Sequence, residues 1–219
     1  MTNSDCQSRL GDDMPKKQFC ALCVAVSEAM SRAETPVHNK RLLETSQFIV
    51  LPSVGPLVPG HVMVVSKGHF ASLASMGVDG IREYESVAGR LRGAPFLRDG
   101  NALETEHGSA EDDKAGACVI HTHVHWIPGM GQFWGEFGEG LALRPEKCLQ
   151  EVGVSGGAYI FARARGGQAF FEARGLRSQT IRRILCDLVD RDDTDWMQAL
   201  RLNWVEETVK AWLEDGQRV

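Results

Sequence analysis

ACVIHTHVHWIP, residues 117–128, contains His121, His123 and His125 at alternate positions, with apolar or β-branched residues between them. Alternation with a period of two is typical of a β-strand, whose successive side chains point to opposite faces of a sheet. On such a strand all three imidazoles lie on one face, with their Cα atoms about 6.6 Å apart along the row. The pattern therefore predicts a row of three histidines on one side of a strand.

Three interpretations of this row are open. Burying three titratable rings is costly without metal, anion or hydrogen-bond partners, so a purely structural role in the core is the least favoured. Alternate histidines can hold the catalytic metal of a metallohydrolase, but such sites usually include carboxylates, and HTHVHWIP has no Asp or Glu. A nucleophilic histidine needs a neutral ring, a neighbour that fixes its tautomer and donors for phosphoryl oxygens, all of which a histidine row can supply.

The rest of the chain alternates predicted strands and helices, so the fold class is α+β. A glycine-rich segment at 129–140 is expected to be a mobile loop. Period-two or β-rich runs predict strands at 48–52, 61–66, 101–106, 158–164 and 168–173, the last two as a hairpin. Apolar residues at helical spacing predict helices within 22–32, 69–92, 178–190 and 195–215.

Composition and charge exclude several classes of protein. The hydrophobic share of 43% and the charged share of 24% are ordinary for a globular protein. Lys and Arg total 24 against 29 Asp and Glu, so no polymeric nucleic acid is expected as a partner. No apolar run approaches a membrane span, and no export signal precedes residue 20, so we expect a cytoplasmic protein without a membrane partner. Because the cytoplasm keeps thiols reduced, Cys20 and Cys23 are better metal ligands than disulfide partners.

Three sequence segments together resemble the histidine-triad (HIT) family. HTHVHWIP is similar to the family's His-x-His-x-His-hydrophobic signature, and FIVLPSVGPLVPGHVMVVSKGH at 48–69 is similar to its two strands linked by a proline turn and a PGH element. CALC at 20–23 matches the zinc-bearing branch of the family. EHG at 106–108 and SQTIRR at 178–183 look like a bacterial branch. The resemblance covers roughly residues 19–130 and is much weaker beyond.

The resemblance implies catalytic and substrate-binding roles for particular residues. His123, the middle histidine, would attack the α-phosphorus and form a nucleotidyl-histidine, and His125 would contact the phosphate or the leaving group. His61 matches another histidine of the phosphate pocket, where its imidazolium form would offset negative charge. Cys118 stands where a hydroxyl donor to phosphate is usual, and Ser53 stands where an acidic residue usually holds the ribose, so both are expected to bind substrate differently from other members.

The resemblance also implies a structural zinc ion. Its ligands would be Cys20, Cys23, His69 and His121, a closed tetrahedral set of two thiolates and two imidazoles. Zinc would attach the N-terminal helix to the histidine strand. It would also turn His121 away from catalysis and leave His123 and His125 facing the substrate.

Taken together, the residues and the resemblance predict an organisation and an activity. We expect a flexible leader at 1–18, a HIT-like catalytic core at 19–130, and a C-terminal part at 131–219 made of the glycine-rich loop, the hairpin and a helical extension, with an antiparallel sheet of about five strands in the fold. The expected activity is hydrolysis or nucleotidyl transfer at a phosphoanhydride, phosphoramidate or nucleotide-sugar bond of a small nucleotide. A metallohydrolase and a non-catalytic nucleotide-binding protein are the alternatives. Since HIT proteins are commonly homodimers, the resemblance also implies a homodimer.

Overall fold

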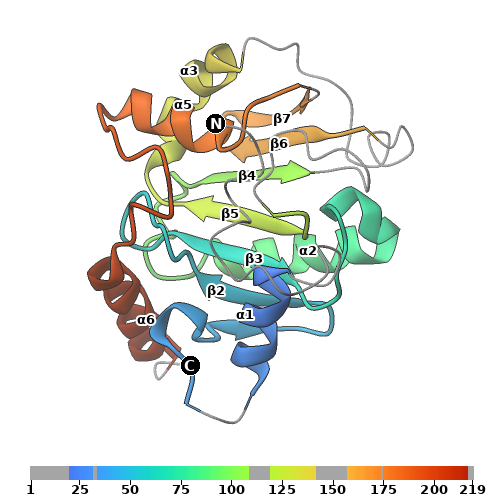
Figure 1. Ribbon diagram of the computed structural model, residues 1–219, viewed down its shortest axis with the longest axis vertical. Helices are drawn as coiled ribbons and strands as arrows, with labels where there is room; N and C mark the ends of the chain where they lie inside the picture. Colours follow the sequence, from blue (N-terminus) through green and yellow to red (C-terminus); the bar gives the residue numbers. More distant parts are fainter. Residues whose placement is uncertain (1–19, 32–33, 109–118, 142–156, 174, 217–219) are drawn as a thin grey trace, which may run out of the picture.

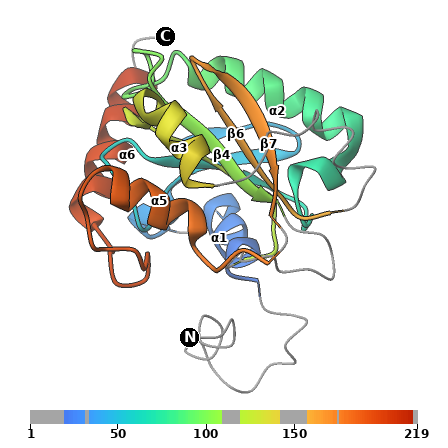
Figure 2. The same cartoon turned by 90° about the horizontal axis from the view of Figure 1, so that it is seen from above.

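The structure is a computed structural model that describes residues 20–31, 34–108, 119–141, 157–173 and 175–216. The expected flexible leader and Cys118 lie outside these ranges. One sheet runs through the molecule, and helices cover both of its faces (Figures 1 and 2).

The sheet is antiparallel throughout and has the strand order β1-β2-β3-β5-β4-β6-β7 (Figure 1). Its strands are β1 (Leu43–Glu44), β2 (Phe48–Pro52), β3 (Val62–Ser66), β4 (Leu103–Gly108), β5 (His123–Ile127), β6 (Tyr159–Ala164) and β7 (Gly167–Glu172). All five strands predicted outside the histidine segment are present. The expectation of about five strands is wrong, because the C-terminal hairpin β6–β7 joins the same sheet through β4 and the short β1 extends the opposite edge.

The helices are α1 (Ala21–Met30), α2 (Gly77–Leu91), α3 (Trp134–Gly140), α5 (Thr180–Leu188) and α6 (Leu202–Gly216). Three 3-10 turns, η1 (Val37–Asn39), η2 (Leu73–Met76) and η3 (Met130–Phe133), link them to the strands. Figure 2 shows α2 on one side of the sheet and α1, α3 and α5 on the other.

The alternation of side chains along β5 determines which face of the sheet each residue lies on. Val124 and Trp126 are buried in a cluster with Tyr84, Val87 and Leu91 of α2. His123 and His125 therefore point to the opposite face, the one covered by α1 and α5. The sequence prediction that these two histidines share a face is confirmed by this register, and the face is the one on which a pocket forms.

The glycine-rich segment expected to be a mobile loop is instead η3 followed by α3. Phe137 is completely buried in the cluster that α5 shares with the sheet, so tertiary packing outweighs the poor helix propensity of glycine. One of the glycines is also required there: a Cβ on Gly140 would lie 2.9 Å from Cγ2 of Ile184. The expectation of a loop is therefore wrong for Met130–Gly140.

The last predicted helix is shorter than expected. Helical spacing predicts a helix within 195–215, but α6 begins only at Leu202 and excludes Trp196. Trp196 packs on the loop after β2 instead, where a Cβ on Gly55 would lie 2.8 Å from the Cβ of the tryptophan. This contact needs an irregular chain path, which helical spacing in the sequence does not reveal.

The C-terminal helix α6 supports the PGH element. Thr208 of α6 accepts a hydrogen bond of 2.8 Å from the backbone N–H of Gly60, which has the left-handed φ of 83°.

No described helix has both the length and the apolar character that crossing a bilayer requires. The cytoplasmic location, the homodimer and the division of the chain at residue 130 stay predictions.

Candidate active site and metal cluster

A pocket of about 530 Å³ lies on the sheet face between α1 and α5. Its floor carries His61, His123 and His125, and one wall is the apolar side of α1 around Leu22. The opposite wall comes from the C-terminal part of the chain and includes Arg182. The predicted catalytic histidines are therefore brought together in a cavity that could hold a small molecule.

The ring of His123 is held in one tautomer by its own strand. Its Nδ1 lies 2.6 Å from the backbone carbonyl oxygen of His121. A carbonyl can only accept, so Nδ1 carries the proton and donates it. The lone pair of a neutral His123 is then on Nε2. Burial lowers the pKa of His123, and this hydrogen bond opposes the shift only in part, so the neutral, nucleophilic form is favoured.

Three groups form a hydrogen-bond relay that ends in the pocket. The backbone N–H of Leu57 donates to Nδ1 of His61 at 3.2 Å, so the proton of neutral His61 is on Nε2. That Nε2–H lies 3.0 Å from Nδ1 of His125, which must accept it. The proton of neutral His125 is consequently on Nε2, which makes this atom a hydrogen-bond donor beside His123; the two rings are 5.1 Å apart at their centroids.

The charge state of His61 differs from the expected imidazolium. Burial first, and the positive charge of Arg182 second, lower the pKa of His61 to about 3. The same two influences, together with the neighbouring histidines, hold the pKa of His125 well below its usual value. Neutral histidines can orient and donate, but they do not neutralise a phosphate.

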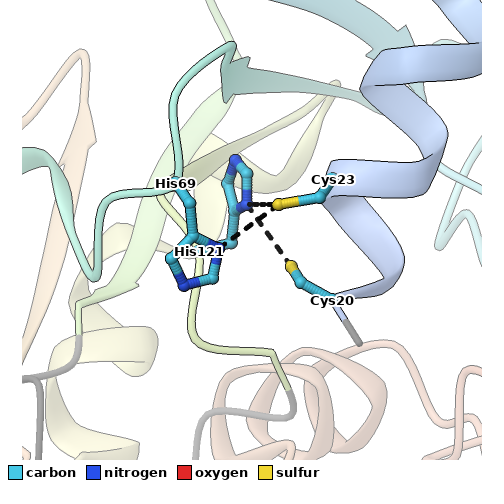
Figure 3. A group of neighbouring side chains, drawn as sticks. All are labelled: Cys20, Cys23, His69 and His121. Atoms are coloured by element: carbon cyan, nitrogen blue, oxygen red, sulfur yellow. Dashed lines mark hydrogen bonds between the residues drawn. The ribbon is translucent and has the colours of Figure 1, made fainter. Parts of the chain in front are cut away.

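Cys20, Cys23, His69 and His121 form a second cluster, in which one ligand atom from each residue lies within 4.8 Å of all the others (Figure 3). Sγ of Cys20 is 3.4 Å from Nδ1 of His121, and Sγ of Cys23 is 3.3 Å from Nδ1 of His69. A tetrahedral zinc ion holds thiolate sulfur and imidazole nitrogen roughly 3.5 Å apart. The cluster therefore has the donors and the spacing of a metal site, and all four predicted ligands are in it.

His121 links the two clusters. Its Nε2–H donates to the backbone carbonyl of Ser66 at 2.8 Å, which leaves Nδ1 for a metal. Its own backbone carbonyl is the acceptor that fixes His123. One residue thus contributes its side chain to the metal cluster and its main chain to the pocket.

Ser53 and Cys118 are the remaining residues predicted to bind substrate, and the structure describes only the first. Ser53 is buried and lines the pocket, and its backbone N–H donates to the carbonyl of His61 at 3.0 Å. Cys118 lies outside the described residues, so its expected contact with phosphate stays a prediction.

Sequence reasoning missed the wall formed by Gln179, Arg182 and Trp196. Arginines on a helix are more often solvated or paired, so the sequence does not single out Arg182 or Arg183 as a site residue. A signal was present: Arg182 is three and four residues before Leu185 and Cys186, on the buried face of α5. An arginine within an apolar stripe is expected to have a buried partner or a ligand.

No family model matches the sequence, and no curated protein matches it. Solved structures do resemble the fold. A HIT family hydrolase from Clostridium thermocellum is 19% identical over 51% of this chain and 91% of its own, with a TM-score of 0.37. A histidine triad nucleotide-binding protein from Candida albicans is 22% identical over 49% of this chain and 73% of its own, with a TM-score of 0.38.

A hypothetical histidine triad nucleotide-binding protein from Sulfolobus tokodaii covers more of the molecule. It is 14% identical over 87% of this chain and 92% of its own, with a TM-score of 0.39. Histidine-triad proteins thus recur among the solved structures to which this chain is similar.

Proposed function

We propose that this protein is a nucleotidyl hydrolase or transferase that cleaves a phosphoanhydride, phosphoramidate or nucleotide-sugar bond through a covalent intermediate on His123. The observation that carries the proposal is the hydrogen bond from Nδ1 of His123 to the carbonyl of His121, which leaves the lone pair of a neutral ring on Nε2 in a side chain that lines the pocket. A fixed neutral imidazole is the state that attacks phosphorus near pH 7.

The relay supplies a hydrogen-bond donor for the leaving group of the first step. Nε2 of His123 attacks the α-phosphorus and forms a P–N bond, while the bond from phosphorus to the leaving group breaks and the leaving group departs with that electron pair. Nε2–H of His125 donates a hydrogen bond to the leaving atom and stabilises its developing negative charge, and His61 holds the His125 ring in the donating tautomer. Water or another acceptor then attacks the phosphorus and loses its proton to solvent, the P–N bond breaks with its electron pair returning to Nε2, and neutral His123 is regenerated.

The apolar wall of α1 suits the nucleoside. Ala21, Leu22 and Ala25 line the pocket on this side, and an apolar surface is the usual contact for the face of a base. Ser53 takes the place of an acidic residue in the same pocket, so ribose binding would rely on a hydroxyl rather than a carboxylate.

We also propose that zinc occupies the cluster of Cys20, Cys23, His69 and His121 as a structural ion. Two thiolates and two imidazoles complete a tetrahedron and leave no open position for substrate. Zinc would stabilise the attachment of α1 to the start of the histidine strand. No described group of three or more metal-binding side chains includes His123 or His125, which favours the nucleophilic role over a metallohydrolase.

Mass spectrometry of quenched mixtures tests the covalent step. The wild type is mixed with a dinucleoside polyphosphate, a nucleoside phosphoramidate and a nucleotide sugar, and quenched within the first turnover. We expect the mass of one nucleotidyl group on the peptide that carries His123, and no adduct in His123→Ala. His38→Ala, at the pocket wall outside the relay, is the matched control and should still form the adduct. Turnover without any adduct, abolished by a chelator that leaves the protein folded, would instead establish a metallohydrolase.

A further inference from the structure

Arg182 is an arginine held at the pocket by contacts to two loops. It is 9% exposed, and it projects from the first turn of α5. Its Nη1 donates to the carbonyl of Gly55 at 2.7 Å, its Nε donates to the carbonyl of Asp193 at 2.9 Å, and its Nη2 lies 3.3 Å from Oδ2 of Asp193. These contacts use three of the five N–H donors of a guanidinium. The same side chain lines the pocket that contains the histidines.

The charge around Arg182 is not balanced by the carboxylate it contacts. Oδ2 of Asp193 also contacts Arg191, and it lies 2.8 Å from Nη2 of Arg201. One carboxylate therefore faces three guanidiniums, and all three remain protonated at any physiological pH. Asp193 is therefore shared and does not neutralise Arg182 by itself, and Arg182 is the one of these three arginines that lines the pocket, where an anionic ligand would offset its charge.

The register of the sheet places this charge at the end of the pocket away from α1. Val65, opposite His123 in β3, packs against α1. His61 lies at the other end of β3, beside the Gly55 loop, and Ile127 at that end of β5 packs against α5. Figure 2 shows α1 and α5 on this same side of the sheet, and Figure 1 shows that they lie over different parts of it, α1 near β2 and β3 and α5 near β4 and β6. The apolar wall, the nucleophile and the cation therefore follow one another across the pocket.

We propose that Arg182 binds a second phosphate of the substrate, next to the one that His123 attacks, so that the preferred substrates are nucleotidyl compounds whose leaving group carries a phosphate. This inference rests on the proposed function. His61 and His125 are joined as a neutral donor and a neutral acceptor, and a polyphosphate chain needs a cation that this pair does not provide. A guanidinium is suited to this contact, because its planar fork matches two phosphate oxygens.

Calorimetric binding of ADP and AMP tests the contact without requiring turnover. We expect wild-type protein to bind ADP about 10- to 100-fold more tightly than AMP, because the β-phosphate gains a charge-assisted hydrogen bond. Arg182→Gln should abolish this preference. Arg183→Gln, its exposed neighbour on α5, should keep it. Preservation of the preference in a folded Arg182→Gln protein would overturn the proposal.

Arg182 also connects two loops, so Arg182→Gln could fail to fold. Circular dichroism of each variant checks this. If Arg182→Gln does not fold, the wild-type protein alone still tests the proposal, because equal affinity of the wild type for ADP and AMP overturns it. Arg182→Lys, which keeps the charge but loses the fork, should retain part of the preference.

Kinetics identify the substrate class. Arg182→Gln should lower kcat/KM for a dinucleoside polyphosphate about 10- to 100-fold and change kcat/KM for a nucleoside phosphoramidate, which releases an amine, by less than about threefold. Equal losses on both substrates would mean that Arg182 only supports the fold of the site, and would overturn the proposal. If ADP binding depends on Arg182 but no adduct forms on His123, the covalent mechanism fails while the phosphate contact stands. If the adduct forms and the ADP preference does not depend on Arg182, only the phosphate contact fails.

Discussion

The metal cluster and the pocket both take histidines from one segment, yet the two sites use opposite ring nitrogens. In the metal cluster, His121 donates from Nε2 to Ser66 and presents Nδ1 to the thiols. In the pocket, His123 donates from Nδ1 to His121 and presents Nε2. The residue type is the same and the positions are two residues apart. The difference teaches that the hydrogen-bond acceptor next to each ring, rather than the histidine itself, determines which ring nitrogen remains available for a ligand.

The largest expected effect is a loss of thermal stability when a ligand of the metal cluster is removed, and it distinguishes this cluster from the pocket. Cys23→Ser removes a thiolate ligand, so zinc measured by atomic spectroscopy should be lost and the thermal midpoint should fall by roughly 10 °C, or about 3–4 kcal/mol for a chain of this length. Ser27→Ala, at an exposed position on the same helix, should change neither. A Cys23→Ser protein with unchanged zinc content and midpoint would show that the cluster is not a structural metal site.

The next effect concerns the hydrogen-bond donor of the pocket. His125→Ala should lower kcat/KM about 10²- to 10³-fold for substrates whose leaving atom develops strong negative charge. The leaving group of a nucleotidyl p-nitrophenyl ester is stable as an anion, so the loss on this substrate should be much smaller, and its adduct on His123 should still form. Steady-state kinetics on the two substrates decide this. An equal loss on both would mean that His125 positions the phosphate and does not assist the leaving group.

The smallest expected effect is a pH dependence of the unfolding free energy that arises from His61 in the pocket. Burial and Arg182 lower the pKa of folded His61 to about 3, whereas an unfolded histidine titrates near 6.5. Between these values the unfolded state binds the extra proton, so this contribution to stability is complete above pH 6.5 and is lost as the pH falls toward 3.

Urea unfolding from pH 6.5 to 4 measures this slope. His61→Gln should flatten the decline in unfolding free energy by up to about 1.4 kcal/mol per pH unit. Acid also weakens the metal cluster, but that loss is common to both proteins and cancels in the difference. Parallel slopes in the two proteins would show that His61 is charged, or solvated, in the folded state.

Local pattern was sufficient to predict every described strand except the short β1. The period-two alternation of β5, His123–Ile127, determines which side chains share a face, and the burial of Val124 and Trp126 confirms this for His123 and His125. His121 lies before the strand begins, so the predicted row of three on one strand holds only for these two. The four metal-cluster residues come from segments far apart in the sequence, and the family motifs, rather than periodicity, identified them as a set. The structure brings all four together.

Long-range packing explains what the sequence did not reveal. Helix α3 exists because Phe137 is buried against α5, and glycine-rich composition gives no sign of that contact. Trp196 leaves the helical pattern to pack on Gly55, about 140 residues earlier in the chain. Arg182 was visible in the sequence, but its role depends on Gly55 and Asp193, which only the folded chain places beside it.

The alternation along β5 has a consequence for changes in chain length. Val124 is completely buried and Trp126 is 3% exposed beneath α2, while His123 and His125 occupy the other face. Deleting one residue between His121 and His123 would shift every later side chain of the strand to the opposite face. His123 would then enter an apolar interior and the indole of Trp126 would enter the pocket, although every residue of the proposed chemistry would still be present. At this strand, insertions and deletions are therefore far less tolerable than substitutions.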